Sequence, residues 1–336
     1  MTAGNVLVTC GGKWVGMVLQ LRRAMAAVGP LAGGKIYVAD RAPLTPAGHF
    51  ADGSFVVSSI DDPGYADCLA DICRRQGVAV VVPLIDLDLL RLAPHHAQFA
   101  AAGARLVCPD PDLTDLCFDK SRFAQFAAAE GILTPRRFAV EDLATAPMPL
   151  FSKPARGFGS IHAGLCSSVK QAREILTLRP DTIFEEYVRA AEISVDAYLA
   201  SSGRCIVRVP RIRDKVVGGE AVQTHTVRIP PVRDAALATI EALARRGLRG
   251  PLNVQVFASE PPRVIEVNTR LGSASVLSNV ACGGRLFAAV LGEACGLPAD
   301  GDPDDYREGV SLYRFLGDVF HDGDSVLDCL PGRAGR

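Results

Sequence analysis

The stretch around which the chain is organised reads Val264-Ile265-Glu266-Val267-Asn268-Thr269-Arg270-Leu271-Gly272-Ser273. Polar and apolar residues alternate along it, which is typical of a β-strand whose two faces meet different surroundings. Ile265 and Val267 share one face, whereas the other face carries an acid, an amide and a base: Glu266, Asn268 and Arg270. Successive members of that face lie roughly 6.6 Å apart. Because carboxylate and amide oxygens bind hard cations and arginine binds anions, this face predicts a binding site.

A second alternating stretch supports this prediction. Asn253-Val254-Gln255-Val256-Phe257 precedes the first stretch, and Pro261-Pro262 marks a turn between them. If the two strands form a hairpin centred between Glu260 and Pro261, Gln255 lies directly opposite Glu266, at the roughly 5 Å separation of cross-strand neighbours. Three oxygen ligands then come together. The alternative is an edge hairpin whose polar face is solvated.

The composition bounds the class of protein. Its 336 residues are 49% apolar, enough for a sizeable core in two or three compact units. A net charge of -1 gives no overall basic field for nucleic acid or an anionic membrane. No apolar run approaches the roughly 18 residues of a membrane-spanning helix, and no secretion signal is indicated. We therefore expect a cytoplasmic protein without nucleic-acid or membrane partners.

Cysteine and histidine usage predicts neither disulfides nor a zinc site. The ten cysteines include no C-x-x-C pair, and several lie inside apolar runs. They are expected to be free thiols that behave as small apolar residues. The six histidines show no zinc-ligand spacing.

Strands and helices alternate through the first third of the chain. Strands are predicted at residues 5–10, 35–40, 55–58, 78–83 and 105–108, and helices from Trp14 to Met25, over 65–76 and over 88–102. This alternation predicts a parallel sheet covered by helices on both faces. The turn with Gly11 and Gly12 matches neither the dinucleotide motif nor the phosphate loop, since Lys13 and Met17 stand where those motifs need a glycine and a lysine.

The pattern changes after Pro109. Helices are predicted over 110–117, 120–130, 169–178, 232–246 and 285–294, and strands over 150–153, 182–184, 193–199, 206–210 and 310–316, besides the hairpin. The segment with Pro147 and Pro149 ahead of its first strand reads as a small inserted unit.

Two stretches in and after this inserted unit carry chemistry. Lys153 ends a strand, and the loop that follows contains Arg156, Gly157, Gly159 and Ser160, which offers cations and accessible N–H groups to a polyphosphate. Alone, this loop is equally well interpreted as a surface turn. Farther on, the backbone of Glu185-Glu186-Tyr187-Val188 can pair with a flat heterocycle, and the carboxylate of Glu192 can accept hydrogen bonds from a ribose.

The order of these groups resembles the ATP-grasp superfamily. It runs from Asp119-Lys120 through Lys153 and its loop, then Glu185 to Val188 and Glu192, to Gln255 and the pattern Glu266-x-Asn268-x-Arg270. The closing pattern is most similar to the carbamoyl-phosphate-synthetase-like branch of carboxylate-amine ligases. The resemblance covers roughly residues 5 to 300, and its closing motif is the specific part.

The resemblance implies an ATP-grasp fold with α/β and α+β parts. It would have an N-terminal parallel α/β domain at residues 1–113 and an ATP-grasp domain at 114–300, with a small lid subdomain at about 134–188 and a C-terminal antiparallel sheet. Residues 301–336 would be an extension. The loop of residues 156–160 would close over the phosphates of ATP, which Lys120 and Lys153 would hold, while Glu185 to Val188 would meet adenine and Glu192 the ribose.

The metal and catalytic roles also follow from the resemblance. Gln255, Glu266 and Asn268 would hold two Mg²⁺ ions, with Mn²⁺ as an alternative. Arg270 would meet the phosphoryl group or the substrate carboxylate, and it is the catalytic candidate together with Lys153. The implied reaction transfers a phosphoryl group from ATP to a carboxylate, and an amine then attacks the acyl phosphate.

The substrates are expected to be a small carboxylate and an amine, both amino-acid or peptide-like, and the enzyme is expected to act in biosynthesis. A homodimer is the oligomeric state to be considered. The alternatives are an enzyme acting on bicarbonate or carbamate and a non-catalytic ATP-binding module. Arg211 and Arg213 share a strand face and are the preferred anion-binding pair, with His225 beyond them; a solvated basic loop is the alternative. Asp86 and Asp88 are candidates to capture a substrate ammonium; an ordinary polar loop is the alternative. Ser273 stands where relatives often carry a glycine-rich turn, and it is a further substrate candidate.

Overall fold

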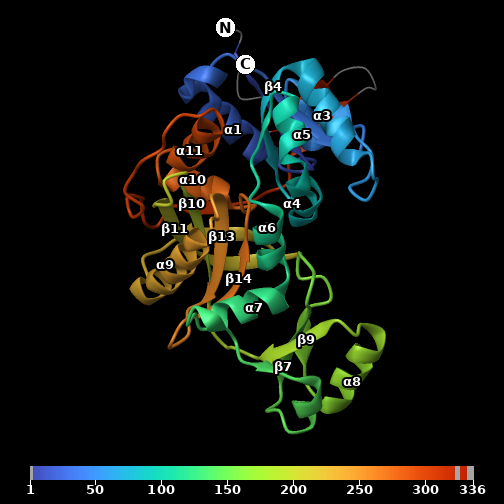
Figure 1. The fold of residues 1–336 in the computed structure, drawn as a ribbon, viewed down its shortest axis with the longest axis vertical. Helices are drawn as coiled ribbons and strands as arrows, with labels where there is room; N and C mark the ends of the chain where they lie inside the picture. The colour runs from blue at the N-terminus through green and yellow to red at the C-terminus, as the bar shows by residue number, and fades with distance from the viewer. Residues whose placement is uncertain (1–2, 322–325, 331–336) are drawn as a thin grey trace.

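The structure is a computed structural model that describes residues 3–321 and 326–330. A five-stranded parallel sheet forms its N-terminal part, at the top of Figure 1, in the order β3-β2-β1-β4-β5. The strands are β1 (Asn5–Thr9), β2 (Ile36–Asp40), β3 (Gly53–Val56), β4 (Val78–Pro83) and β5 (Arg105–Leu106). The helices are α1 (Val15–Ala27), α2 (Pro46–Phe50), α3 (Tyr65–Gln76), α4 (Asp86–Leu92) and α5 (His96–Ala101). The predicted parallel α/β unit is confirmed.

One helix of this unit differs from the prediction. The segment predicted as a single helix over 88–102 is divided into α4, a 3-10 turn (Ala93–His95) and α5. Pro94 lies in the first residues of that turn, where its missing N–H and fixed φ interrupt an α-helix.

The strand order marks where a ligand would bind. The neighbours of β1 are β2 on one side and β4 on the other, so the chain leaves β1 in one direction and returns on the opposite side. In open parallel sheets, ligands bind beyond the carboxyl ends of the strands at such a reversal. The turn with Gly11 and Gly12 and the loop that leads to Asp86 both lie at that edge.

A six-stranded antiparallel sheet forms the centre of the molecule, in the order β14-β13-β10-β11-β12-β15. The strands are β10 (Glu192–Leu199), β11 (Cys205–Val217), β12 (Glu220–Thr226), β13 (Gly250–Phe257), β14 (Arg263–Asn268) and β15 (Ser311–Tyr313). The helices that pack on it are α6 (Pro111–Phe118), α7 (Lys120–Ala129), α9 (Pro230–Arg245), α10 (Ser275–Ala281) and α11 (Arg285–Ala294). Strand β12 was not predicted, because Thr224 and Thr226 occupy two of its buried positions and blur the alternation.

A small third sheet lies at the bottom of Figure 1, far from the parallel sheet. It runs β6-β9-β7-β8, with β6 (Arg137–Phe138), β7 (Leu150–Pro154), β8 (Gly164–Cys166) and β9 (Thr182–Glu186). A 3-10 turn (Val140–Ala144) and helix α8 (Val169–Leu178) complete this lid, whose core includes Leu150 and Phe184. A hairpin of β16 (Asp318–His321) and β17 (Val326–Leu330), which was not predicted, follows β15.

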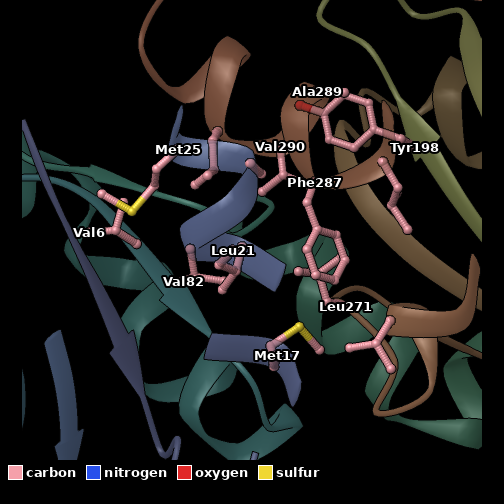
Figure 2. Packing of buried hydrophobic residues seen from close by; sticks show 14 of the residues in the cluster. Val6, Met17, Leu21, Met25, Val82, Tyr198, Leu271, Phe287, Ala289 and Val290 are labelled. Carbon is pink, nitrogen blue, oxygen red and sulfur yellow. The ribbon is translucent and has the colours of Figure 1, made fainter. Parts of the chain in front are cut away.

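One hydrophobic core joins the N-terminal sheet to the C-terminal helices. Figure 2 shows Met17 and Leu21 of α1 beside Val82 of β4 and Phe287 of α11, and all four are buried. The core therefore fixes the carboxyl edge of the parallel sheet against the end of β14. Within the described ranges, no single helix is long and apolar enough to cross a membrane; α10 and α11 pass that test only as a pair bent by 103°.

Candidate active site

The hairpin of β13 and β14 has the predicted register. Gln255 pairs with Glu266, and Asn253 pairs with Asn268. Asn268 Nδ2 lies 3.4 Å from Glu266 Oε1, so the two side chains of the motif are in contact. The register shifts beside Gln255, which leaves Ile265 as an extra residue between the paired Val264 and Glu266. Ile265 consequently lines a chamber beside Glu266, and the prediction that it faces away from the site is wrong.

A chamber of about 380 Å³, here called the lid chamber, lies between the lid and the antiparallel sheet. It brings together nearly all of the residues predicted to hold a nucleotide. Its lining includes Lys120, Lys153, Gly157, Gly159, Ser160, Glu185, Glu186, Tyr187, Val188, Glu192, Gln255 and Glu266. These residues come from α7, β7, β9, β10, β13, β14, the loop after β7 and the segment after β9, so the fold gathers segments that are far apart in the sequence.

The charges in the lid chamber are held in pairs. Lys153 Nζ lies 2.7 Å from Glu185 Oε2, and Arg137 Nε donates to Glu185 Oε1 at 3.1 Å. The side chains of Lys153 and Glu185 are only 7% and 5% exposed, and a buried charge needs such a partner. Lys120 Nζ donates to the carbonyl of Gly157 at 2.8 Å, which ties helix α7 to the glycine loop. Burial lowers the pKa of Lys120, and Glu266 opposes this effect from 3.9 Å.

Arg213 joins the ribose and metal candidates. Its Nη1 donates to Gln255 Oε1 at 3.2 Å and forms an ion pair with Glu192. Its Nη2 donates to the carbonyl of Gly219 at 2.7 Å. Burial raises the pKa of Glu192, and the Arg213 charge partly offsets that rise. Arg213 was predicted as a substrate residue, but it lies on the boundary between the two halves of the site.

The glycine loop forms the wall between two chambers. Phe158, Gly159, Ser160 and Ile161 line both the lid chamber and a second chamber of about 750 Å³, here called the interdomain chamber. The loop rests on the tip of the β11–β12 hairpin, since a Cβ on Gly219 would lie 2.8 Å from the carbonyl carbon of Gly159. Such an approach requires glycine at position 219.

The interdomain chamber lies between the parallel and antiparallel sheets. Its charged lining residues are Lys13, Asp40, Asp86, Arg211, Arg213, Glu220, Glu266 and Arg270, and Ser273 also lines it. Arg270 donates through Nε and Nη2 to the two oxygens of Asp86, at 2.9 and 2.7 Å. This bidentate pair connects the segment after β14 to the first residue of α4, so Asp86 already has a cationic partner.

Arg211 is held by a buried acid. Its Nε donates to Asp196 Oδ2 at 2.8 Å, and Asn253 and Ser278 donate to the same carboxylate at 2.6 Å each. The side chain of Arg211 is 4% exposed, and its Nη1 has no hydrogen-bond partner within the described residues. A buried, fixed guanidinium with an unused donor suits an anionic ligand.

Three of the predicted site residues do not line either chamber. Asp88 is fully buried and accepts hydrogen bonds from Thr9 and from Tyr65 OH, the latter at 2.9 Å, so it has no access to a substrate ammonium. His225 lies 2.7 Å from Asp214 on the exposed side of the β11–β12 hairpin. Arg156 forms ion pairs with Asp115 and Asp119, at 2.6 and 3.2 Å, which turn its guanidinium away from the chamber.

The sequence did not single out Asp40, Arg137 or Asp196. Asp40 had a usable signal, because an acid that ends the second strand of a parallel sheet lies beside the turn after the first strand. No pattern in the sequence pointed to Asp196 or Arg137. Each contacts its partner, Arg211 or Glu185, only because the fold brings the two segments together.

Two family models match the sequence. One describes a PylC-like N-terminal domain and matches residues 6–107; the other describes an ATP-grasp domain and matches residues 117–274. The chain carries an ATP-grasp domain. The match confirms the resemblance and the fold class predicted from the sequence. No curated protein matches the chain in sequence.

Solved structures share the fold of this ATP-grasp protein. The biotin carboxylase domain of 2-oxoglutarate carboxylase from Hydrogenobacter thermophilus, a dimer solved with MgADP and bicarbonate, has a TM-score of 0.74 and 16% identity, over 93% of this chain and 74% of that one. The L-amino acid ligase of Bacillus licheniformis has a TM-score of 0.69 and 17% identity, over 89% and 76%. The N5-carboxyaminoimidazole ribonucleotide synthetase of Thermotoga maritima has a TM-score of 0.63 and 19% identity, over 89% and 77%. At these identities the likeness is one of fold.

Proposed function

We propose that this protein is an ATP-dependent, ADP-forming ligase that activates a carboxylate as an acyl phosphate and couples it to an amine. The observation that carries the proposal is the lid chamber. It gathers two lysines, a glycine loop, an extended strand end and the paired Gln255 and Glu266 around one cavity. Each of these groups matches a part of a magnesium nucleotide, and their convergence is hard to explain as a solvated surface.

In this proposal the lid chamber binds ATP. The strand end Glu185 to Val188 faces adenine, and Glu192 faces the ribose hydroxyls. Lys120, Lys153 and the loop from Gly157 to Ser160 surround the phosphates. Because Lys120 is tied to the Gly157 carbonyl, a nucleotide that displaces this contact also moves the loop.

The donor set fits magnesium. Gln255, Glu266 and Asn268 offer one carboxylate and two amide oxygens, the hard ligands that Mg²⁺ takes when phosphates supply the remaining positions. Lys120 Nζ faces Glu266 from 3.9 Å, which is beyond hydrogen-bond distance, so the carboxylate can still bind a metal ion. When bound, the metal ions would neutralise the charge that develops on the transferred phosphoryl group.

The carboxylate and the amine would meet in the interdomain chamber. Arg270 stands at its boundary with the motif and is held in place by Asp86, so it is oriented toward an anion before any ligand arrives. Arg211 offers a second anion contact. The chamber measures about 750 Å³, which favours a substrate larger than bicarbonate. We therefore prefer amino-acid-like substrates to the bicarbonate alternative, and the cytoplasmic location and the homodimer stay predictions.

A screen of carboxylate and amine pairs tests the proposal. With MgATP, ADP and phosphate should appear in equal amounts only when both partners of a productive pair are present. The products separate on an anion-exchange column, and phosphate is measured independently. Formation of AMP and pyrophosphate, or ATP hydrolysis that no pair accelerates, would contradict the proposed reaction.

A further inference from the structure

The carboxylates of the interdomain chamber are not equally neutralised. Four of them line it, and three face a cation: Asp86 is paired with Arg270, Glu220 lies 2.7 Å from Lys13, and Glu266 faces Lys120. The fourth, Asp40, has no cationic partner in residues 3–321. An acid without a cation in a cavity of this size is available to a ligand.

Asp40 is nevertheless held in a fixed orientation. Its Oδ2 accepts a hydrogen bond from the Gly12 N–H at 3.0 Å, and its Oδ1 accepts one from Ala42 N–H at 3.1 Å. A Cβ on Gly12 would lie 2.9 Å from Asp40 Oδ2, so the glycine permits this close approach. A carboxylate has about four lone-pair sites, and two of them stay open here.

Cationic side chains line the same chamber. Arg211 and Arg270 are both among its lining residues, and Arg270 follows Asn268 of the metal motif by two residues in the sequence. Asp40 ends β2, whereas Asp86, which holds Arg270, follows β4, and these two strands flank β1. Adjacent strands are spaced by about 4.8 Å, so the backbone ends of β2 and β4 lie roughly 10 Å apart, which separates Asp40 from the pair of Asp86 and Arg270. Charges on a single α-carbon are too close together to reach both.

We propose that Asp40 binds the primary ammonium of a substrate whose carboxylate and ammonium are separated by several methylene groups, and that it thereby sets specificity. The inference deepens the proposed function and rests on it, because the carboxylate end would lie at Arg270, where it is activated. An ammonium held by Asp40 stays protonated and cannot attack an acyl phosphate. Its role is recognition, and the attacking amine belongs to the second substrate.

Trp14 provides a direct readout of this chamber. It is the only tryptophan in the sequence, and it lines the interdomain chamber. Its fluorescence can be titrated with three series of carboxylates of increasing length: ω-amino, ω-hydroxy and unsubstituted. The ω-hydroxy series tests whether the Asp40 carboxylate binds a hydroxyl group, as in a sugar, in place of an ammonium. The titration needs no ATP turnover, so its failure and the failure of the ligase proposal are distinguishable.

We expect the full-length protein to bind the ω-amino carboxylate of optimal length about tenfold more tightly than its hydroxy and unsubstituted counterparts. Asp40→Asn keeps the shape and loses the charge, so it should reduce this preference to about twofold or less while leaving the unsubstituted series unchanged. Asp62→Asn changes the net charge equally on an exposed loop and should keep the full preference. Circular dichroism checks the fold of each variant.

Asp40→Glu gives a second, independent result. It keeps the charge and moves it by one methylene into the chamber, so the optimal ligand should become shorter by about one methylene. The proposal is overturned if the unsubstituted protein shows no ω-amino preference, if it prefers the hydroxy series, or if the preference survives in Asp40→Asn. An optimum that does not move in Asp40→Glu also contradicts it.

Discussion

Arg270 connects the two halves of the site at the scale of a single residue. It extends from the strand that carries Glu266 and Asn268, and it grips Asp86 on the opposite domain with two hydrogen bonds. Burial, the largest single effect, lowers the pKa of Arg270, but the charge and hydrogen bonds of Asp86 together with the charges of Glu266 and Asp196 outweigh it, and the net pKa is raised. The guanidinium therefore stays charged where a phosphoryl group or carboxylate would meet it.

Asp88 lies two residues after Asp86, and its burial predicts a pH-dependent stability. Burial raises its pKa from 3.8 to about 6. A raised pKa in the folded state means that the contribution of Asp88 to stability is fully present below pH 3.8 and is lost as the pH rises through about 6. Asp88→Asn, which carries no charge at any pH, should therefore become more stable than the unsubstituted protein as the pH rises.

Urea unfolding at several pH values measures this effect. The difference in the free energy of unfolding between Asp88→Asn and the unsubstituted protein should grow by about 2 kcal/mol from about pH 4.5 to about pH 8. A difference that is constant over this range would show that Asp88 does not titrate as inferred.

The β11–β12 hairpin is the element that links the parts of the site. Arg213 on β11 contacts both Glu192 and Gln255, and Gly219 at the tip supports the glycine loop. Glu220, the first residue of β12, pairs with Lys13 in the turn of the parallel sheet. The hairpin thus touches the lid chamber, the loop between the chambers and the N-terminal domain.

Gly219→Ala should weaken nucleotide binding through this contact. The added methyl would meet the Gly159 backbone at 2.8 Å, and the φ of +77° is strained for alanine. We expect the KM for ATP to rise about tenfold, because the loop can no longer close over the phosphates.

Gly218→Ala is the matched control. Its φ of +57° imposes a similar strain, but no atom lies within 4 Å of the added methyl. Its KM for ATP should stay within about twofold of the unsubstituted value, since backbone strain without the clash leaves the loop in place. Equal effects of the two substitutions in steady-state kinetics would refute the contact as the cause.

At the scale of the whole molecule, one core fixes the interdomain chamber. Met17 and Leu21 of α1 pack against Phe287 of α11, so the two ends of the chain hold the parallel sheet over the antiparallel one. The lid has its own small core around Leu150 and Phe184. The arrangement places the large interdomain chamber next to the smaller lid chamber, with the glycine loop as the wall between them.

Much of this architecture follows from local patterns in the sequence. The Val-rich strand of β4, the helices α3, α8 and α11 and the register of Gln255 with Glu266 were predicted because each depends on periodicity or on a single turn. The partners of long charged side chains were not predictable. Arg213 forms an ion pair with Glu192, and Arg156 forms one with Asp115. Asp88 accepts a hydrogen bond from Tyr65. These partners depend on which segments of the chain meet in the folded structure. Asp40 was also missed, although its place at the end of the second parallel strand was a usable signal in the sequence.

Glu266→Ala gives the most direct measurement of the central claim that this site binds a magnesium nucleotide for catalysis. With a productive substrate pair and MgATP, ADP formation should fall by at least about 100-fold, because the metal loses its only carboxylate ligand among Gln255, Glu266 and Asn268. The thermal unfolding midpoint should change little, since Glu266 is partly exposed. Glu174→Ala on the exposed face of α8 removes a carboxylate outside the chambers and should keep full activity. Near-normal ADP formation by a folded Glu266→Ala protein would contradict the account.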